Sequence, residues 1–239
     1  MFANFEKLKG SDMKKLALII TTLLLSVSVF AQEDVTKFLG IPIDGFKPEM
    51  IKKLKAKGYT EHSYKPDVLV GEFNGRDVEV SVVTNNNKVY RIFVQDAYTV
   101  DEYNIKIRYN TLCEQFENNK RYISMAVEGQ SIPDDEDISD QMLYEDKRYE
   151  ALYFQVPEQV DTLAVQTALR ERVLAKYTEE QLANPTSEMQ EEVLKTTFDI
   201  AFEIYEKKSV WFTIDKTGNQ YRILMYYDNK NNQANGEDL

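Results

Sequence analysis

The side chains that most often carry enzyme chemistry are scarce in this sequence, which contains a single cysteine, Cys113, and a single histidine, His62. A thiolate activated by an imidazole could act as a nucleophile in hydrolysis, provided that the two side chains meet in the fold. Cys113 follows Leu112 in an amphipathic segment, where a cysteine usually packs as a small hydrophobic residue. His62 lies in a polar stretch before a predicted strand. Zinc sites built from several Cys and His ligands are excluded.

Carboxylates offer a second kind of chemistry. An acidic run could supply the hard oxygen ligands that calcium prefers. It lacks the glycine and the spacing of an EF-hand loop, so a solvated charged loop is the simpler interpretation. A pair of carboxylates could also hydrolyse glycosides, but nothing in the sequence singles out two of them. We therefore predict no metal site and no cofactor. The acidic run consists of Asp134, Asp135, Glu136, Asp137 and Asp140.

Aromatic side chains are abundant, with 15 Tyr, 12 Phe and one Trp. Tyr149 and Tyr153 share one face of a predicted strand, opposite Leu152, and Trp211 lies opposite Val210 on another strand. If helices cover only one side of the sheet, Tyr149, Tyr153 and Trp211 could form an exposed platform for a sugar, a peptide or a protein. The alternative is that helices cover this face too and that the rings belong to the core, which is the commoner role of aromatic residues in strands.

The elements that must position these residues follow from turn signals and hydrophobic periodicity. Pro48 is placed as the first residue of a helix. Asn74-Gly75 predicts a hairpin, and residues 77–84 alternate as a half-buried antiparallel strand does. A capping box at residues 99–102 predicts the start of a helix that runs to about Glu117.

The same kinds of pattern predict the elements of the second part of the chain. Residues 128–146 are acidic and turn-rich, which favours a mobile connection. A strand is expected over 148–156, helices over 162–207, and a hairpin around Gly218-Asn219. The tail, 229–239, is polar, and we expect it to be frayed.

The predicted element order is α-βββ-α-β-α-α-ββ, in which local hairpins dominate. This order indicates an α+β fold with a mainly antiparallel sheet and packed helices. The segments 38–123 and 144–228 each combine helices with strands, so a diverged duplication is possible within a single domain over 32–239. The content of hydrophobic residues, 43%, is ample for a core.

The formal net charge is −11. Such an acidic chain repels phosphate backbones, so nucleic acid is excluded as a partner.

Residues 13–31 match a cleavable signal peptide. Two lysines precede an apolar stretch that ends in Val29-Phe30-Ala31, which predicts cleavage before Gln32. Residues 1–12 have no role in such a signal and indicate a start codon placed too far upstream. The apolar stretch is shorter than the ~20 residues of a membrane-spanning helix. We expect export to the periplasm, the cell surface or the medium, without stable membrane insertion after cleavage.

Segments near both ends of the chain resemble uncharacterised exported proteins of the Bacteroidota. The segments are GIPIDG at 40–45, GEFNG at 71–75 and ANGEDL at 234–239. The resemblance implies a setting in the envelope of a Gram-negative cell, and it supplies no functional residues.

The leading functional hypothesis is a non-enzymatic binding module that recognises a protein, a peptide or a glycan. One alternative is a hydrolase that uses carboxylates or the Cys113/His62 pair. Another is a structural protein of the envelope.

Overall fold

The computed structural model describes residues 34–126, 129–158, 160–234 and 236. The predicted signal peptide at 13–31 lies outside them. The chain divides into two compact units. The sheet unit consists of Val35–Val156 and Tyr205–Leu239, and the helical unit contains Pro157–Ile204. This division differs from the expected halves, 38–123 and 144–228, because both of those segments contribute strands to one continuous sheet.

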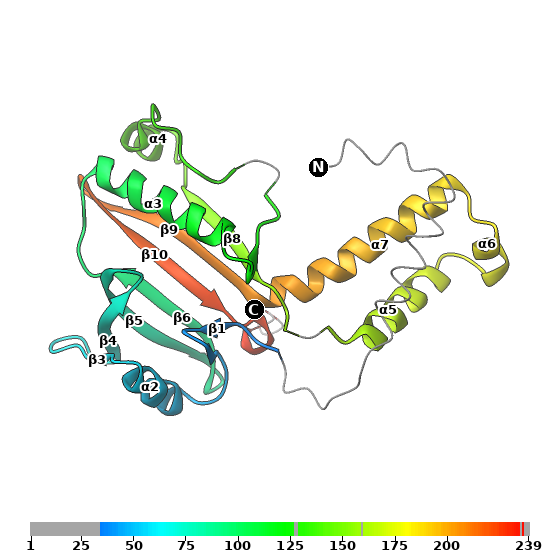
Figure 1. The fold of residues 1–239 in the computed structure, drawn as a ribbon, viewed down its shortest axis with the longest axis horizontal. Helices are drawn as coiled ribbons and strands as arrows, with labels where there is room; N and C mark the ends of the chain where they lie inside the picture. The colour runs from blue at the N-terminus through cyan, green and yellow to red at the C-terminus, as the bar shows by residue number, and fades with distance from the viewer. Residues whose placement is uncertain (1–33, 127–128, 159, 235, 237–239) are drawn as a thin grey trace. The chain divides into compact units, whose positions relative to one another are not determined.

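The sheet unit is built on an eight-stranded sheet in which all neighbouring strands are antiparallel (Figure 1). Together with the packed helices, it confirms the α+β fold and the order of the main elements. A separate pair of short strands, β1 (Lys37–Phe38) and β2 (Ile41–Pro42), precedes it. Across the sheet, the strands run β3 (Thr60–Glu61), β4 (Val68–Phe73), β5 (Arg76–Asn85), β6 (Lys88–Asp96), β10 (Gln220–Asp228), β9 (Ser209–Thr217), β8 (Glu150–Gln155) and β7 (Tyr122–Ile123).

Three α-helices of this unit share one face of the sheet. They are α2 (Lys47–Ala56), α3 (Glu102–Glu117), which Figure 1 shows running along the sheet, and α4 (Ile138–Tyr144). Their buried apolar side chains belong to one cluster with every second residue of the long strands. We call this side the covered face. The intervening strand residues point to the other side, which we call the open face. Part of this face is buried, because Phe154, Ser209 and Asp228 are 3%, 7% and 5% exposed as whole residues.

Turn chemistry places several of these elements as expected. Asn74 and Gly75, with φ of 54° and 71°, form the two-residue turn between β4 and β5, because both residue types tolerate positive φ. Pro48 lies in the first turn of α2, and Met50 and Leu54 are its buried residues. Gly71 in β4 has a packing role, since a Cβ there would lie 2.7 Å from the Tyr59 ring.

Three local expectations are wrong. The N-cap of α3 is Asp101, whose carboxylate accepts from the backbone N–H of Asn104, so the helix starts later than the capping box at 99–102 predicts. The acidic connection contains α4, which Asp137 caps. The tail is held as far as a short 3-10 helix, η3 (Lys230–Asn232), because Asn229 is buried and its side chain donates to the carbonyl of Ile43.

The helical unit contains α5 (Thr162–Leu174), α6 (Glu179–Ala183) and α7 (Ser187–Tyr205). Helices α5 and α7 are linked by ion pairs, among them Arg172 with Glu203 at 2.7 Å. Their described buried residues are few, namely Val173, Met189, Thr196 and Ile200. The core of this unit is therefore thin. A 3-10 turn, η2 (Glu206–Lys208), leads back into β9.

Candidate functional site

The structure separates the three rings that the sequence groups into one platform. Tyr149 and Tyr153 point to the covered face and are 5% and 0% exposed. The Tyr153 ring stacks on Phe116 of α3 with centroids 4.6 Å apart, and the Tyr149 hydroxyl donates to Glu136. An exposed platform that includes Tyr149 and Tyr153 is thus wrong. The strand period correctly pairs them, but α3 lies over the face on which they were expected to be free.

Trp211 lies on the open face and is partly exposed. Its cross-strand neighbours are Tyr226 on β10 and Leu152 on β8, and Tyr226 in turn lies opposite Phe93 on β6. We call Phe93, Tyr226, Trp211 and Leu152 the open-face row. Phe93, Tyr226 and Trp211 are partly exposed, and Leu152 is 43% exposed. A straight line of apolar side chains therefore crosses four strands.

The rings of the open-face row pack against one another. Trp211 and Tyr226 stack with centroids 3.9 Å apart and an interplanar angle of 13°. The Phe93 ring follows at 5.1 Å from Tyr226. Ring faces that contact neighbouring rings are not free for a ligand. The Tyr226 ring has ring neighbours in both Trp211 and Phe93, so the row offers ring edges, the remaining surface of Trp211 and the Leu152 methyl groups to a partner.

A charged pair flanks this row. Asp228, on β10, accepts from Arg91 Nε at 2.5 Å and from Arg91 Nη2 at 2.8 Å, a bidentate pair. The second Asp228 oxygen also accepts from Trp211 Nε1 at 3.0 Å. The hydrogen bond to Asp228 raises the pKa of Arg91. The guanidinium lies 4.9 Å from the centre of the Tyr226 ring, within range for a cation–π interaction. This pair fixes the Trp211 ring in place.

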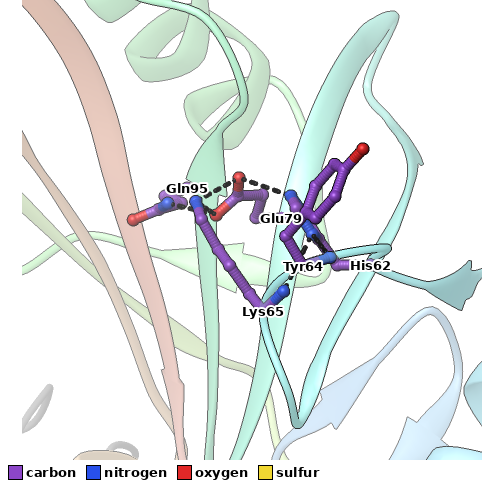
Figure 2. Close-up of polar contacts among 5 residues, drawn as sticks. All are labelled: His62, Tyr64, Lys65, Glu79 and Gln95. Atoms are coloured by element: carbon purple, nitrogen blue, oxygen red, sulfur yellow. Dashed lines mark hydrogen bonds and ion pairs between the residues drawn. The ribbon is translucent and has the colours of Figure 1, made fainter.

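A second polar cluster lies on the other side of the row, beside Gln95 of β6. Figure 2 shows its side chains. Glu79, on β5, accepts from Lys65 Nζ at 2.6 Å and from Gln95 Nε2 at 2.6 Å. Burial alone would raise the pKa of Glu79, but the hydrogen bonds and the charge of Lys65 outweigh it and lower the pKa. His62 Nδ1 accepts from the backbone N–H groups of Tyr64 and Lys65, at 3.0 and 3.1 Å. Its Nε2 lies 3.6 Å from Glu79, beyond hydrogen-bond range.

The hydrolytic pair proposed from the sequence does not assemble. Cys113 is buried in the core on the covered face, whereas His62 adjoins Glu79, whose side chain lies on the open face. Burial also raises the pKa of the Cys113 thiol to about 11, so it is protonated at neutral pH and a poor nucleophile. His62 instead organises the loop that carries Lys65.

The acidic run has structural roles. Glu136 accepts from Lys147 and Tyr149, and the hydrogen bond from Lys147 is the main cause of its lowered pKa. The Asp137 carboxylate caps α4. Among the described residues, no group of three or more His, Cys, Asp or Glu side chains is arranged to hold a metal ion.

Sequence reasoning missed Phe93, Tyr226, Arg91 and Asp228. The alternation of β6 and β10 assigns these residues to the face opposite Ile92 and Tyr227. What the sequence could not supply was which of the two faces the helices cover.

Comparison with protein-family models, with curated proteins and with solved structures gives no match to this chain. The resemblance to exported Bacteroidota proteins therefore stays a prediction. Within the described parts of the chain, no helix is both long and apolar enough to cross a membrane.

Proposed function

We propose that this protein is an exported, non-enzymatic binding module that recognises a protein or peptide partner on its open face. The observation that carries the proposal is the open-face row of Phe93, Tyr226, Trp211 and Leu152, which lies in register across four strands and is partly exposed. Aromatic residues held in place by their neighbours are typical of the centre of protein interfaces.

The ring geometry favours a protein or peptide over a glycan. A sugar ring usually stacks on the flat face of an aromatic ring, but one face of Trp211 and one face of Tyr226 contact each other, which leaves fewer ring faces for a sugar. Apolar side chains of a partner can instead pack against ring edges and Leu152, which is 43% exposed. Burial of such apolar surface contributes about 25 cal/mol per Å².

The net charge of the chain, rather than the ion pairs beside the row, favours a partner with basic groups. Arg91 is already paired with Asp228, and Lys65 with Glu79. The chain carries a net charge of −11. A basic partner would be attracted over long range, which accelerates encounter more than it strengthens the complex. We therefore expect association to slow as salt is added.

Export is proposed from residues 13–31, with cleavage before Gln32. Its test is the N-terminal sequence of the protein recovered from cells that express the full chain. A protein beginning at Gln32 in the periplasm or medium supports export. An intact N-terminus in the cytosol contradicts it.

The binding proposal is tested by affinity capture from the native envelope, followed by measurement of the captured partner's affinity. We expect Phe93→Ala and Trp211→Ala each to weaken binding about 30-fold or more, because central interface aromatics contribute at least about 2 kcal/mol. Tyr103→Ala and Tyr144→Ala are matched controls, since these rings are 73% and 78% exposed and belong to helices on the covered face. Both controls should leave binding unchanged. Equal losses in all four variants, or none in the first two, would contradict the proposal.

A further inference from the structure

A pocket of about 260 Å³ lies where the turn between β4 and β5 meets the end of β6 and the helix α3. We call it the Arg108 pocket. It is separate from the residues of the open-face row and does not depend on the proposed partner. Residues 75–77, Asp96, Tyr98, Val100 and Arg108 line it.

Arg108 is a buried cation whose hydrogen-bonding groups have few partners in the protein. Its side chain is 7% exposed. Within the described structure its guanidinium has one hydrogen bond, from Nη2 to Asp96 at 3.3 Å, and the buried Nε has no partner. Charge-assisted hydrogen bonds of this type are normally about 2.7–2.9 Å long. A buried donor left without a partner is costly. Nε itself has almost no accessible surface, so a ligand in the pocket would bind the part of the guanidinium that lines it.

The group that best fits a guanidinium is a carboxylate, which accepts two parallel hydrogen bonds. A simple anion is nevertheless a poor match for this pocket, because Asp77 and Asp96 also line it. A simple cation would face Arg76 and Arg108. A ligand that carries both charges matches a lining with two acidic and two basic side chains.

The volume of the pocket and its remaining lining residues restrict the class of ligand further. The volume, about 260 Å³, lies just below the roughly 300–1,000 Å³ of pockets for drug-sized ligands. Val100 supplies an apolar wall, and Tyr98, which is 73% exposed, stands at the rim. An aromatic ring attracts an ammonium group through cation–π interaction.

We propose that the Arg108 pocket binds a small free α-amino acid, with its carboxylate on Arg108 and its ammonium group toward Asp77, Asp96 and Tyr98. A free amino acid carries both charged groups on one carbon, which a chain-internal peptide residue does not.

The test is isothermal titration calorimetry, in which the purified protein is titrated with three matched probes. These are L-alanine, L-alaninamide, which lacks the carboxylate, and N-acetyl-L-alanine, which lacks the ammonium group. We expect saturable binding of L-alanine with one site per chain. Each derivative should bind at least about tenfold more weakly, because each loses a charge-assisted contact. No saturable binding of L-alanine, or equal affinities for the three probes, would overturn the proposal.

Variants locate the site. Arg108→Met should abolish L-alanine binding. Arg148→Met is the control, because the Arg148 side chain is 83% exposed, and it should leave L-alanine binding unchanged. If Arg108→Met fails to fold, Tyr98→Ala decides, because the exposed ring is not needed for packing. Weaker L-alanine binding in Tyr98→Ala supports the assignment, and unchanged affinity refutes it.

Discussion

Asp228→Asn removes the negative charge of the carboxylate to which both Arg91 and Trp211 donate hydrogen bonds, and it keeps the size of the side chain. Deleting one partner of a buried ion pair costs about 3–5 kcal/mol, mostly because the other charge is left unpaired. Asp228 is 7% exposed, but the Arg91 side chain keeps 22% exposure, so water can solvate part of the guanidinium. We therefore expect a loss at the lower end, about 3 kcal/mol in the free energy of unfolding.

Urea denaturation followed by tryptophan fluorescence measures this loss directly, because Trp211 is the only tryptophan of the chain and donates to Asp228. The melting temperature should fall by roughly 6–12 °C, given about 2–4 °C per kcal/mol for a domain of this size. The Arg91→Met/Asp228→Asn double variant should lose less than the sum of the two single variants, because the residues interact.

Glu150→Gln is the matched control. Glu150 and Arg148 lie 4.0 Å apart with side chains that are 46% and 83% exposed. Such a surface pair contributes at most about 1 kcal/mol. If Asp228→Asn costs no more than Glu150→Gln, the Arg91–Asp228 pair does not anchor the open face, and the reasoning is refuted.

Three further predictions use the same protein. Tyr153→Ala should destabilise the protein by about 3–5 kcal/mol in urea, as removal of a buried aromatic ring does; a loss below that of Trp211→Ala would contradict the burial of Tyr153. The Cys113 thiol, with its pKa raised to about 11, should resist a thiol reagent at pH 8 in the native state and react fully in urea; rapid native labelling would show that it is accessible. Glu79, whose pKa is lowered from 4.5, should stabilise the fold at pH 7, and this contribution should be lost as the pH falls below 4.5 and through the lower folded-state value. The urea midpoint of Glu79→Gln should therefore change less between pH 7 and pH 3 than that of the unsubstituted protein. An equal change would show that Glu79 does not contribute to the pH dependence of stability.

Local chemistry in the sequence was enough to predict most of the elements. Asn74-Gly75 and Gly218-Asn219 carry turn preferences that act over two residues, and the hairpins form where they predict. Ile105, Tyr109 and Leu112 in α3 are spaced four and three positions apart, as residues on one side of a helix are, and all three are buried. In these cases the determining contacts are close in sequence.

The candidate site depended on information that is not local. Alternation along a strand tells which residues share a face, but only the packing of α3 decides that Tyr153 is buried and Trp211 is not. Arg91 and Asp228 are 137 positions apart, and they meet because β6 pairs with β10. The order of strands in the sheet had to be known before these residues could be joined into one surface.

Site-specific photo-crosslinking in living cells probes the open face most directly. Leu152 can be replaced by p-benzoyl-L-phenylalanine at the end of the open-face row, and Tyr144, which is 78% exposed and belongs to α4 on the covered face, provides the matched position. We predict a discrete protein adduct from position 152 that is absent from position 144 and that Trp211→Ala diminishes. No adduct at position 152, or the same adducts from both positions, would contradict a binding role for this face.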